Sequence, residues 1–252
     1  MAAELTEDAV LGGRLTLKQP KRGHRVGNDA ILLAAATMAE SGERAVDLGA
    51  GVGAAGLALA MRVAGVAVIL LDVDPDLVAL AEYNIARNGL SGRARAATLD
   101  VTGPPEAFAA AELSSGSAHH VLMNPPFNSS ERHNVSPDLE RRSAHVAKAT
   151  SLRDWVATAA RLLRPAGTLT MIWRADGLAD VLTALTPQFG GIGLLPVHGR
   201  AGQPAIRILL RATKASRAPL TLLEGLVLND RTGQPTAQAE ALLRGGQALA
   251  LG

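Results

Sequence analysis

A glycine-rich turn between an apolar strand and an apolar helix constrains the fold of this chain more than any other feature. Residues 44–48 (RAVDL) have the composition of a buried strand, residues 49–56 (GAGVGAAG) contain four glycines, and residues 57–62 continue as an apolar helix. Glycine adopts backbone conformations that other residues avoid, and it lets a ligand come close to the backbone. The pattern predicts the first strand, turn and helix of a parallel α/β sheet whose turn binds a ligand.

The spacing of these glycines leaves two classes of enzyme open. Residues 51–56 satisfy G-x-G-x-x-G, the fingerprint of dinucleotide-binding dehydrogenases. Asp47, however, precedes the first glycine, where its carboxylate can face a cationic group. An anionic pyrophosphate would prefer a bare helix N-terminus. Asp47 therefore favours a cofactor with a cationic end over a dinucleotide.

Two further predicted strands each end in an acid. The apolar run 66–71 is followed by Asp72, and the run 93–99 is followed by Asp100. Ligands of open α/β sheets bind outside the carboxyl ends of the strands. An acid in the position of Asp72 can accept both hydroxyls of a ribose, and Asp100 can accept from the amine of an adenine ring. Together they predict an adenosine site beside the glycine turn.

A fourth predicted strand, 121–123, stops at Asn124-Pro125-Pro126-Phe127. Each proline removes a backbone donor and fixes φ, so the chain is stiff and extended just beyond the strand end. The Asn124 amide oxygen accepts a hydrogen bond, and a proline carbonyl offers a second acceptor with no competing N–H. Two acceptors and an aromatic face suit a flat base that carries an exocyclic amine.

Basic side chains flank the predicted site in the sequence. Candidates for contacts with the phosphates of an RNA substrate are Lys21, Arg22, Arg25, Arg141 and Arg142. The first three precede a predicted helix over 30–36, which Asn28 or Asp29 can cap. The other two belong to a long polar stretch, 128–145, of the kind that forms binding segments. A net charge of +2 adds little support for a nucleic-acid partner.

Composition excludes several other classes of protein. A hydrophobic content of 48% and a charged content of 19% are typical of a globular chain. The absence of cysteine excludes disulfides, thiol nucleophiles and Cys-ligated zinc. His133 and His145 lack companions at metal-ligand spacing, so no metal is expected. The acidic start lacks a signal peptide and no apolar run reaches membrane-spanning length, so we expect a cytoplasmic protein without a membrane partner. The oligomeric state is left open.

Four features in chain order resemble class I S-adenosylmethionine-dependent methyltransferases: residues 47–53 (DLGAGVG), Asp72, Asp100 and residues 124–127 (NPPF). The NPPF signature is similar to that of the amino methyltransferases that act on adenine N6, guanine N2 or a glutamine side-chain amide.

More narrowly, residues 17–19 (LKQ), 25–33 (RVGNDAILL) and 226–230 (LVLND) resemble the bacterial methyltransferases that modify the adenine beside the anticodon of a valine tRNA. The likeness extends over nearly the whole chain. Asn28 stands where threonine is expected and Phe127 where tyrosine is commoner. A short polar side chain and an aromatic face are kept at these two positions.

The resemblance implies an α/β, Rossmann-like class I methyltransferase fold, with a seven-stranded, mostly parallel sheet and helices on both faces. The whole chain, 1–252, is then one methyltransferase domain. It would comprise an N-terminal hairpin and helix (1–40), a Rossmann-like core (41–212) and a C-terminal strand and helix extension (213–252).

The resemblance also implies S-adenosylmethionine as cofactor and an RNA, most simply a tRNA, as substrate. The implied cofactor-binding residues are Gly27, Asn28, Asp47, Gly49, Gly51, Gly53, Asp72 and Asp100. The implied catalytic residues are Asn124, Pro125, Pro126 and Phe127. Asn124 and the Pro125 carbonyl would accept the two N–H groups of the target amine, while Phe127 would stack on the base.

Three alternatives share part of this pattern. A protein glutamine methyltransferase or an rRNA guanine N2-methyltransferase would use the same NPPF geometry, although glutamine-modifying enzymes usually carry a separate N-terminal helical domain. A dehydrogenase would explain the glycines and Asp72 but leave residues 124–127 without a role. A non-enzymatic RNA-binding or cofactor-sensing module would keep the fold without turnover.

Overall fold

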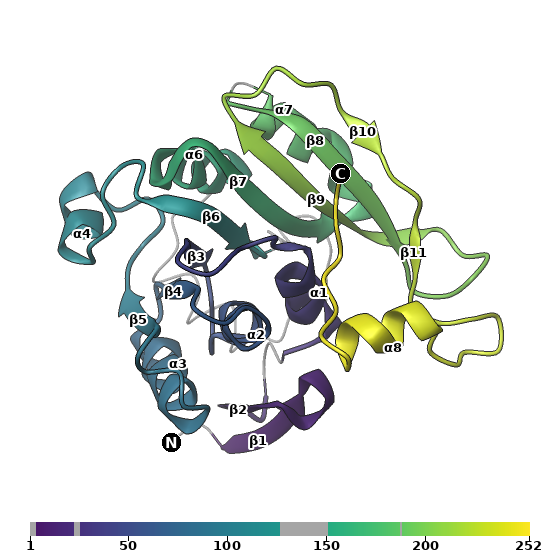
Figure 1. Ribbon diagram of the computed structural model, residues 1–252, viewed down its shortest axis with the longest axis horizontal. Helices are drawn as coiled ribbons and strands as arrows, with labels where there is room; N and C mark the ends of the chain where they lie inside the picture. Colours follow the sequence, from purple (N-terminus) through teal and green to yellow (C-terminus); the bar gives the residue numbers. More distant parts are fainter. Residues whose placement is uncertain (1–3, 23–25, 127–150, 187) are drawn as a thin grey trace.

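The computed structural model describes residues 4–22, 26–126, 151–186 and 188–252. A large sheet runs through the middle of the molecule, and a small hairpin lies beside it (Figure 1). The longer strands of the sheet are β3 (Arg44–Leu48), β4 (Ala67–Asp72), β5 (Ala94–Thr98), β6 (Ala118–Met123), β7 (Leu163–Arg174), β8 (Phe189–His198) and β9 (Ala205–Lys214). From one edge to the other they follow the order β8-β9-β7-β6-β3-β4-β5. Strand β9 is antiparallel to both of its neighbours, and the other neighbouring pairs among these strands are parallel. The mostly parallel sheet is thereby confirmed.

The predicted number of strands is too low, because the described residues form a sheet of nine. The additional strands, β10 (Thr221–Leu222) and β11 (Leu226–Val227), both pair in parallel with β8. The sequence predicted one strand in the C-terminal extension, 213–252. Leu222 lies opposite Leu194, and Leu226 lies opposite Val197. Between these two pairs the C-terminal segment advances by four residues and β8 by only three. One residue of the C-terminal segment therefore cannot pair with β8, and the segment forms two short strands in place of one.

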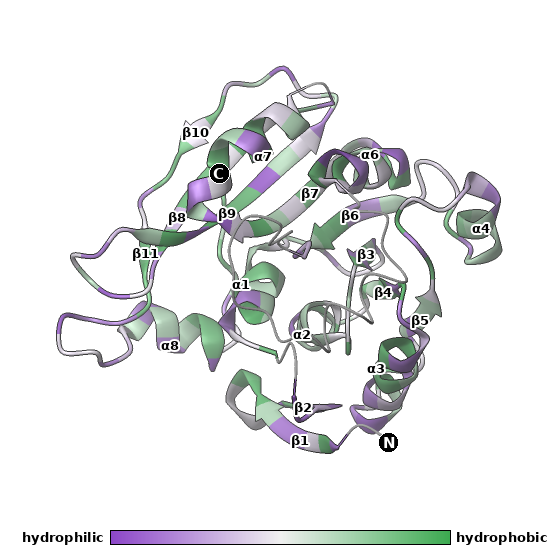
Figure 2. Cartoon of the chain, turned by 180° about the vertical axis from the view of Figure 1, so that it is seen from behind, coloured by the Kyte–Doolittle hydropathy of each residue, from purple (hydrophilic) through white to green (hydrophobic). Residues whose placement is uncertain are grey.

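Helices cover both faces of the sheet, as predicted (Figure 1). On one face lie α1 (Asn28–Ala36), α2 (Ala54–Arg62), α3 (Pro75–Arg87) and α8 (Ala237–Leu243), and on the other α4 (Pro105–Ala110), α6 (Leu152–Leu162) and α7 (Leu178–Leu185). Figure 2 shows hydrophobic and hydrophilic stretches alternating along α3 and α6, the pattern of helices with one buried side. Successive strand residues enter opposite clusters: Val121 and Met123 pack with α6, and Leu122 packs with α1 and α2. The near-continuous apolar runs of β3, β4 and β6 follow from burial on both faces.

The N-terminal hairpin consists of β1 (Leu5–Val10), the 3₁₀ turn η1 (Leu11–Gly13) and the antiparallel strand β2 (Leu15–Pro20). Asn84 of α3 and Asn88, the C-cap residue of that helix, hold β2 by its backbone. Asn88 accepts from the Thr16 N–H (2.9 Å) and donates to the Thr16 carbonyl (2.8 Å). Asn84 accepts from the Lys18 N–H (2.7 Å) and donates to the Lys18 carbonyl (3.0 Å). Each side-chain amide thus forms with β2 the pair of backbone hydrogen bonds that a neighbouring strand would form.

The C-terminal segment returns to the core. The Leu249 N–H donates to the Ala35 carbonyl at the end of α1 (2.8 Å), and Leu249 and Leu251 are buried in the same cluster as α1 and α2. The organisation as one domain stays a prediction. The division at residues 40 and 212 stays a prediction.

Candidate active site at the carboxyl edge of the sheet

The register of the strands brings the predicted site residues to one edge. Leu48 of β3 lies opposite both Leu71 of β4 and Met123 of β6. The residues that follow these three are Gly49, Asp72 and Asn124, so they leave the sheet side by side. In the next strand, Thr98 lies opposite Asp72, two residues before Asp100. The sequence-predicted cluster of glycine turn, two acids and asparagine is therefore assembled by the parallel register.

The glycine turn is held in a left-handed backbone conformation at three positions, with φ of 69° at Gly49, 56° at Gly51 and 91° at Gly53. A Cβ on Gly49 would lie 2.5 Å from Cη2 of Trp155, and one on Gly53 would lie 2.8 Å from Cδ1 of Leu70. At both positions a Cβ would crowd a buried side chain, in addition to the strain of the positive φ. A Cβ on Gly51 would meet no described atom within 4 Å. Gly51 is thus the point of the turn that another molecule can approach.

Asp47 is buried beneath this turn, with 2% of its surface exposed. Its Oδ2 accepts from the Gly56 N–H in the first part of α2 (2.8 Å). Burial raises the pKa of Asp47 to about 7, against the opposing effect of that hydrogen bond. This hydrogen bond therefore joins strand β3 to helix α2. The predicted contact of Asp47 with the cationic end of a cofactor stays a prediction.

Asp72 joins the end of β4 to the turn. Its Oδ2 accepts from the Gly51 N–H (2.8 Å) and its Oδ1 from the Asp74 N–H (3.0 Å). Burial raises the pKa of Asp72, while its backbone hydrogen bonds oppose the change. Each carboxylate oxygen has a second lone pair, so the group can still accept two hydroxyls.

Asp100 follows β5 and is exposed. Its Oδ1 accepts from both the N–H and the hydroxyl of Thr102 (2.8 Å each). The residue lines an open hollow of about 500 Å³ between β5 and α4, together with Thr98, Leu99 and Gly103 among others. The geometry thus offers a carboxylate beside space at the same edge as Asp72.

Asn124 carries an unsatisfied acceptor. Its Oδ1 is buried and finds no hydrogen-bond partner among the described residues. The neighbouring Met123 and Pro125 are buried as well, and Pro126 is exposed. A buried acceptor without a partner costs free energy, about 1 to 3 kcal/mol in typical cases. Such an atom at a strand end, beside a ligand-approachable turn, is arranged to receive a donor from outside the protein.

The segment before α1 differs from the prediction at one point. Gly27, in an extended conformation, is the N-cap residue of α1 and Asn28 its first helical residue, and no side chain caps the helix. Asp29 instead accepts from Nε of Arg207 in β9 (2.8 Å). The expected cap by Asn28 or Asp29 is wrong because a tertiary ion pair takes the Asp29 carboxylate and the helix begins at Asn28, two residues earlier than predicted. The cofactor contact expected of Gly27 and Asn28 stays a prediction.

The predicted RNA contacts are only partly described. Lys21 is exposed and forms an ion pair with Glu4 across the hairpin (2.7 Å), and Arg22 is exposed next to it. Arg25, Phe127, Arg141 and Arg142 lie outside the described residues.

Two buried residues of the site were missed by the sequence reasoning. Trp155 of α6 packs in the core and also forms the wall against Gly49. Asn84, fully buried, donates to the Val52 carbonyl inside the glycine turn (3.0 Å) in addition to its bonds with Lys18. The signal for Asn84 is its place between Ala81 and Ile85, on the apolar side of α3. A polar residue there must have buried partners.

The described residues contain no group of three acidic or histidine side chains arranged for a metal ion. Among those same residues, no helix is long and apolar enough to cross a bilayer.

Comparisons with known proteins match this geometry. Residues 24–195 match the methyltransferase small domain family. A tRNA1(Val) (adenine(37)-N6)-methyltransferase from Porphyromonas gingivalis is 28% identical over 229 residues, which cover 87% of each chain. The crystal structure of a protein described as a predicted O-methyltransferase, from Agrobacterium tumefaciens, aligns with a TM-score of 0.74 and 30% identity over 88% of this chain and 98% of its own.

The fold is shared more widely. A 16S rRNA guanine-N2 methyltransferase from T. thermophilus, solved with S-adenosylmethionine and guanosine, aligns with a TM-score of 0.57 and 22% identity, covering 84% of this chain and 50% of its own. The strand order, the glycine turn and the family match agree. The chain belongs to the methyltransferase small domain family and is an S-adenosylmethionine-dependent methyltransferase.

Proposed function

We propose that this enzyme methylates the exocyclic N6 amine of an adenine in tRNA. The observation that carries the proposal is the buried, unpartnered Oδ1 of Asn124 at the carboxyl edge of the sheet. An exocyclic amine has two N–H groups, and Asn124 is followed by proline, whose carbonyl is a second acceptor. The name of the P. gingivalis relative, an adenine N6-methyltransferase of tRNA, supports the choice of base and of RNA.

The residues present fit the cofactor. S-adenosylmethionine supplies a methyl group on a positively charged sulfonium. In our proposal the backbone of Gly49, Gly51 and Gly53 lines its methionyl part, and the open space at Gly51 supports this role. Asp47 holds the turn in place and would face the cationic end, and Gly27 and Asn28 would contact the cofactor from the start of α1.

The adenosine part of the cofactor falls to the two acids that follow β4 and β5. Asp72 accepts from the ribose hydroxyls while it keeps its hydrogen bond from the Gly51 N–H. Asp100 accepts from the adenine amine beside the open hollow. Both assignments use lone pairs that the internal hydrogen bonds leave available.

The chain's own contribution to methyl transfer is orientation. Asn124 Oδ1 accepts one N–H of the target amine and the Pro125 carbonyl accepts the other, which turns the nitrogen lone pair out of conjugation and toward the methyl group. Pro126 keeps the segment extended, and Phe127 stacks on the base. Holding the two reactants in line supplies much of the rate. No base is required before transfer, because the methylated ammonium product is acidic.

Other nucleophiles differ in how many hydrogen bonds they can donate to these two acceptors. The guanine N2 amine and the glutamine amide also present two N–H groups, so the same acceptors would hold them. A hydroxyl nucleophile would satisfy one acceptor and leave the second buried and unpaired. We therefore place an amino group ahead of the oxygen nucleophile that the description of the A. tumefaciens protein suggests for that protein.

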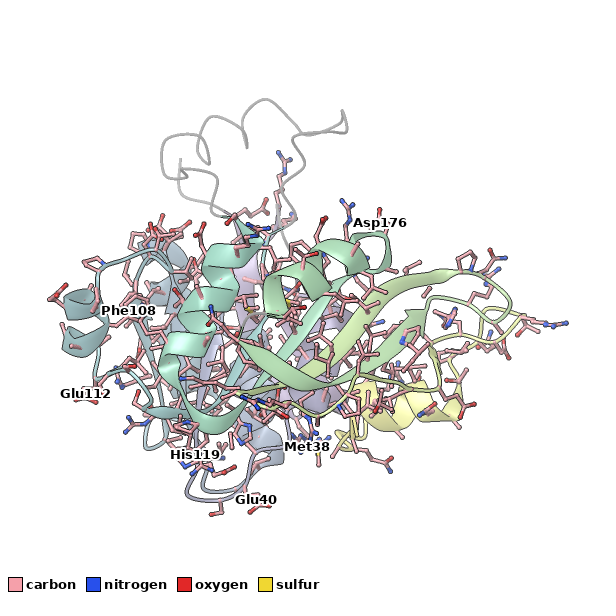
Figure 3. All side chains as sticks on the ribbon, turned by 90° about the horizontal axis from the view of Figure 1, so that it is seen from above. Met38, Glu40, Phe108, Glu112, His119 and Asp176 are labelled. Atoms are coloured by element: carbon pink, nitrogen blue, oxygen red, sulfur yellow. The ribbon has the colours of Figure 1, made fainter. Side chains whose placement is uncertain are left out.

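The test is transfer of a labelled methyl group from S-adenosylmethionine to unmodified total tRNA, followed by nucleoside analysis. We expect N6-methyladenosine from wild type and a loss of at least 100-fold in rate for Asn124→Ala, with S-adenosylhomocysteine affinity unchanged. His119→Ala, at the opposite edge of the sheet (Figure 3), is the control and should retain full transfer. Label in N2-methylguanosine or in protein would reject adenine, and binding of cofactor without any transfer would favour a sensor.

A further inference from the structure

A pair of arginines faces each other at the carboxyl edge of the sheet. Arg174 ends β7 and lies directly opposite Arg207 of the antiparallel strand β9. Like charges in opposite positions of neighbouring strands destabilise a sheet. The repulsion between the two arginines must be offset by other contacts in the protein. Its presence suggests that the two guanidinium groups bind a ligand.

Each arginine is held by its own carboxylate. Asp176 accepts from Nε and Nη2 of Arg174 (2.8 and 3.0 Å), and Asp29 accepts from Nε of Arg207 (2.8 Å). The two-point contact fixes the plane of the Arg174 guanidinium, although 45% of the side chain is exposed. A guanidinium held in this way presents a fixed, flat face to a ligand.

An open hollow lies against this pair. It has a volume of about 420 Å³ and is lined by Arg174, Ala175, Asp176, Ala205, Ile206 and Arg207. Ile206 is 50% exposed, which adds an apolar surface beside the guanidinium planes. Figure 3 places Asp176 at the edge opposite to Glu40 and His119, which lie at the amino ends of β3 and β6.

The hollow is close to the proposed methyl-transfer site. Strand β7 is the neighbour of β6, and Met171 lies opposite Met123, so Asn124 leaves the sheet beside Ile172. Arg174 is two residues further along β7, about 7 Å at the rise of a strand. Leu122 and Ile172 enter the same core cluster, so Asn124 and Arg174 continue the same face of the sheet.

We propose that the Arg174–Ile206 hollow binds an unpaired nucleotide that flanks the target base, by stacking on the guanidinium plane and on the isoleucine side chain. Unpaired RNA bases stack on arginine planes as well as on aromatic rings. A guanidinium already fixed by a carboxylate loses less freedom when it binds than a mobile one does. This inference rests on the proposed RNA substrate and adds to it a binding position outside the catalytic motif.

The experiment compares Arg174→Ala and Ile206→Ala with Arg164→Ala. Arg164 is the matched control because it lies at the other end of the same strand, is 51% exposed and also contacts a carboxylate, that of Glu43. We expect the first two variants to raise the KM for unmodified tRNA and its Kd about tenfold. The kcat at saturating tRNA and the Kd for S-adenosylhomocysteine should stay at wild-type values, as should every parameter of Arg164→Ala.

Arg174→Lys separates stacking from charge. Lysine keeps the positive charge without the plane, so this variant should bind tRNA as weakly as Arg174→Ala. Wild-type affinity in Arg174→Lys, or in both alanine variants, would overturn the inference while wild-type methylation of tRNA left the proposed function standing. If wild type transferred no methyl group to tRNA and bound none, the proposed function and this position would both be rejected.

Discussion

The side-chain nitrogen of Asn84 in α3 donates a 3.0 Å hydrogen bond to the carbonyl of Val52, inside the glycine turn. The same amide pairs with both backbone groups of Lys18 in β2. One buried side chain therefore joins the N-terminal hairpin, helix α3 and the turn that we propose as the cofactor cradle. Asn88, four residues further on, pairs with Thr16 of the hairpin, and no hydrogen bond among the described residues joins it to the turn.

Asn84→Ala should weaken both stability and cofactor binding. The substitution removes the hydrogen-bond partner of the buried Val52 carbonyl and of two partly buried backbone groups of Lys18, which costs about 1 to 3 kcal/mol in unfolding free energy. Loss of the Val52 contact should raise the Kd for S-adenosylhomocysteine about tenfold, as measured by calorimetry well below the melting temperature. Asn88→Ala is the control, with a similar loss of stability and unchanged affinity. Equal affinities in the two variants would show that Asn84 acts on the hairpin alone.

Substitution of the turn glycines should have two different effects, one mainly on stability and one mainly on cofactor affinity. Gly49→Ala adds a Cβ against Trp155 at a positive φ, so unfolding free energy should fall by about 3 kcal/mol from strain and overpacking together. Gly51→Ala meets open space and should cost about 1 kcal/mol through its φ alone. The Gly51 variant should nevertheless lose more affinity for S-adenosylhomocysteine than its stability loss accounts for. Urea unfolding with a parallel binding titration measures both effects, and full affinity in Gly51→Ala would contradict the proposed cradle.

Stability should depend on pH through Asp47. Burial raises its pKa to about 7, so between about pH 4 and pH 7 the folded chain binds more protons at this group than the unfolded chain does. The free energy of unfolding therefore falls as pH rises through this window, by at most about 1.4 kcal/mol per pH unit. Asp72, whose pKa burial also raises, acts in the same direction.

Asp47→Asn isolates this effect. The variant cannot ionise at position 47, so its stability relative to wild type should increase from pH 4 to pH 7 and level off above that. Urea unfolding of both proteins at matched pH values measures the difference. A difference that stays constant across the window would show that Asp47 is ionised throughout.

Removal of the unpartnered acceptor should not destabilise the protein. Asn124 Oδ1 makes no hydrogen bond with the described residues, so Asn124→Ala should unfold within about 0.5 kcal/mol of wild type, or at higher denaturant. Met123→Ala, one residue earlier and fully buried, should lose about 2 to 5 kcal/mol by comparison. A large loss of stability in Asn124→Ala would mean that the side chain has a structural partner.

Much of the core and site could be predicted from local patterns. An apolar run ending in an acid located β4, a second run ending in an acid located β5, the glycines located the turn after β3, and two prolines located the end of β6. These signals are local because a strand buried on both faces must be apolar throughout and a left-handed turn requires glycine. The parallel order of the strands then places their carboxyl ends at one edge, so Gly49, Asp72 and Asn124 could be grouped before any contact was known.

The features that local sequence patterns could not predict depend on contacts between segments far apart in the chain. The tail is divided into β10 and β11 because its register slips by one residue against β8. Asp29 binds Arg207, 178 residues away, in place of capping α1, and Asn84 reaches the turn from a different helix. Trp155 and Arg174 acquire their neighbours only when α6 and β9 are in place. A residue's own chemistry sets what it can bind, but which partner it meets depends on the register and packing of segments distant in the chain.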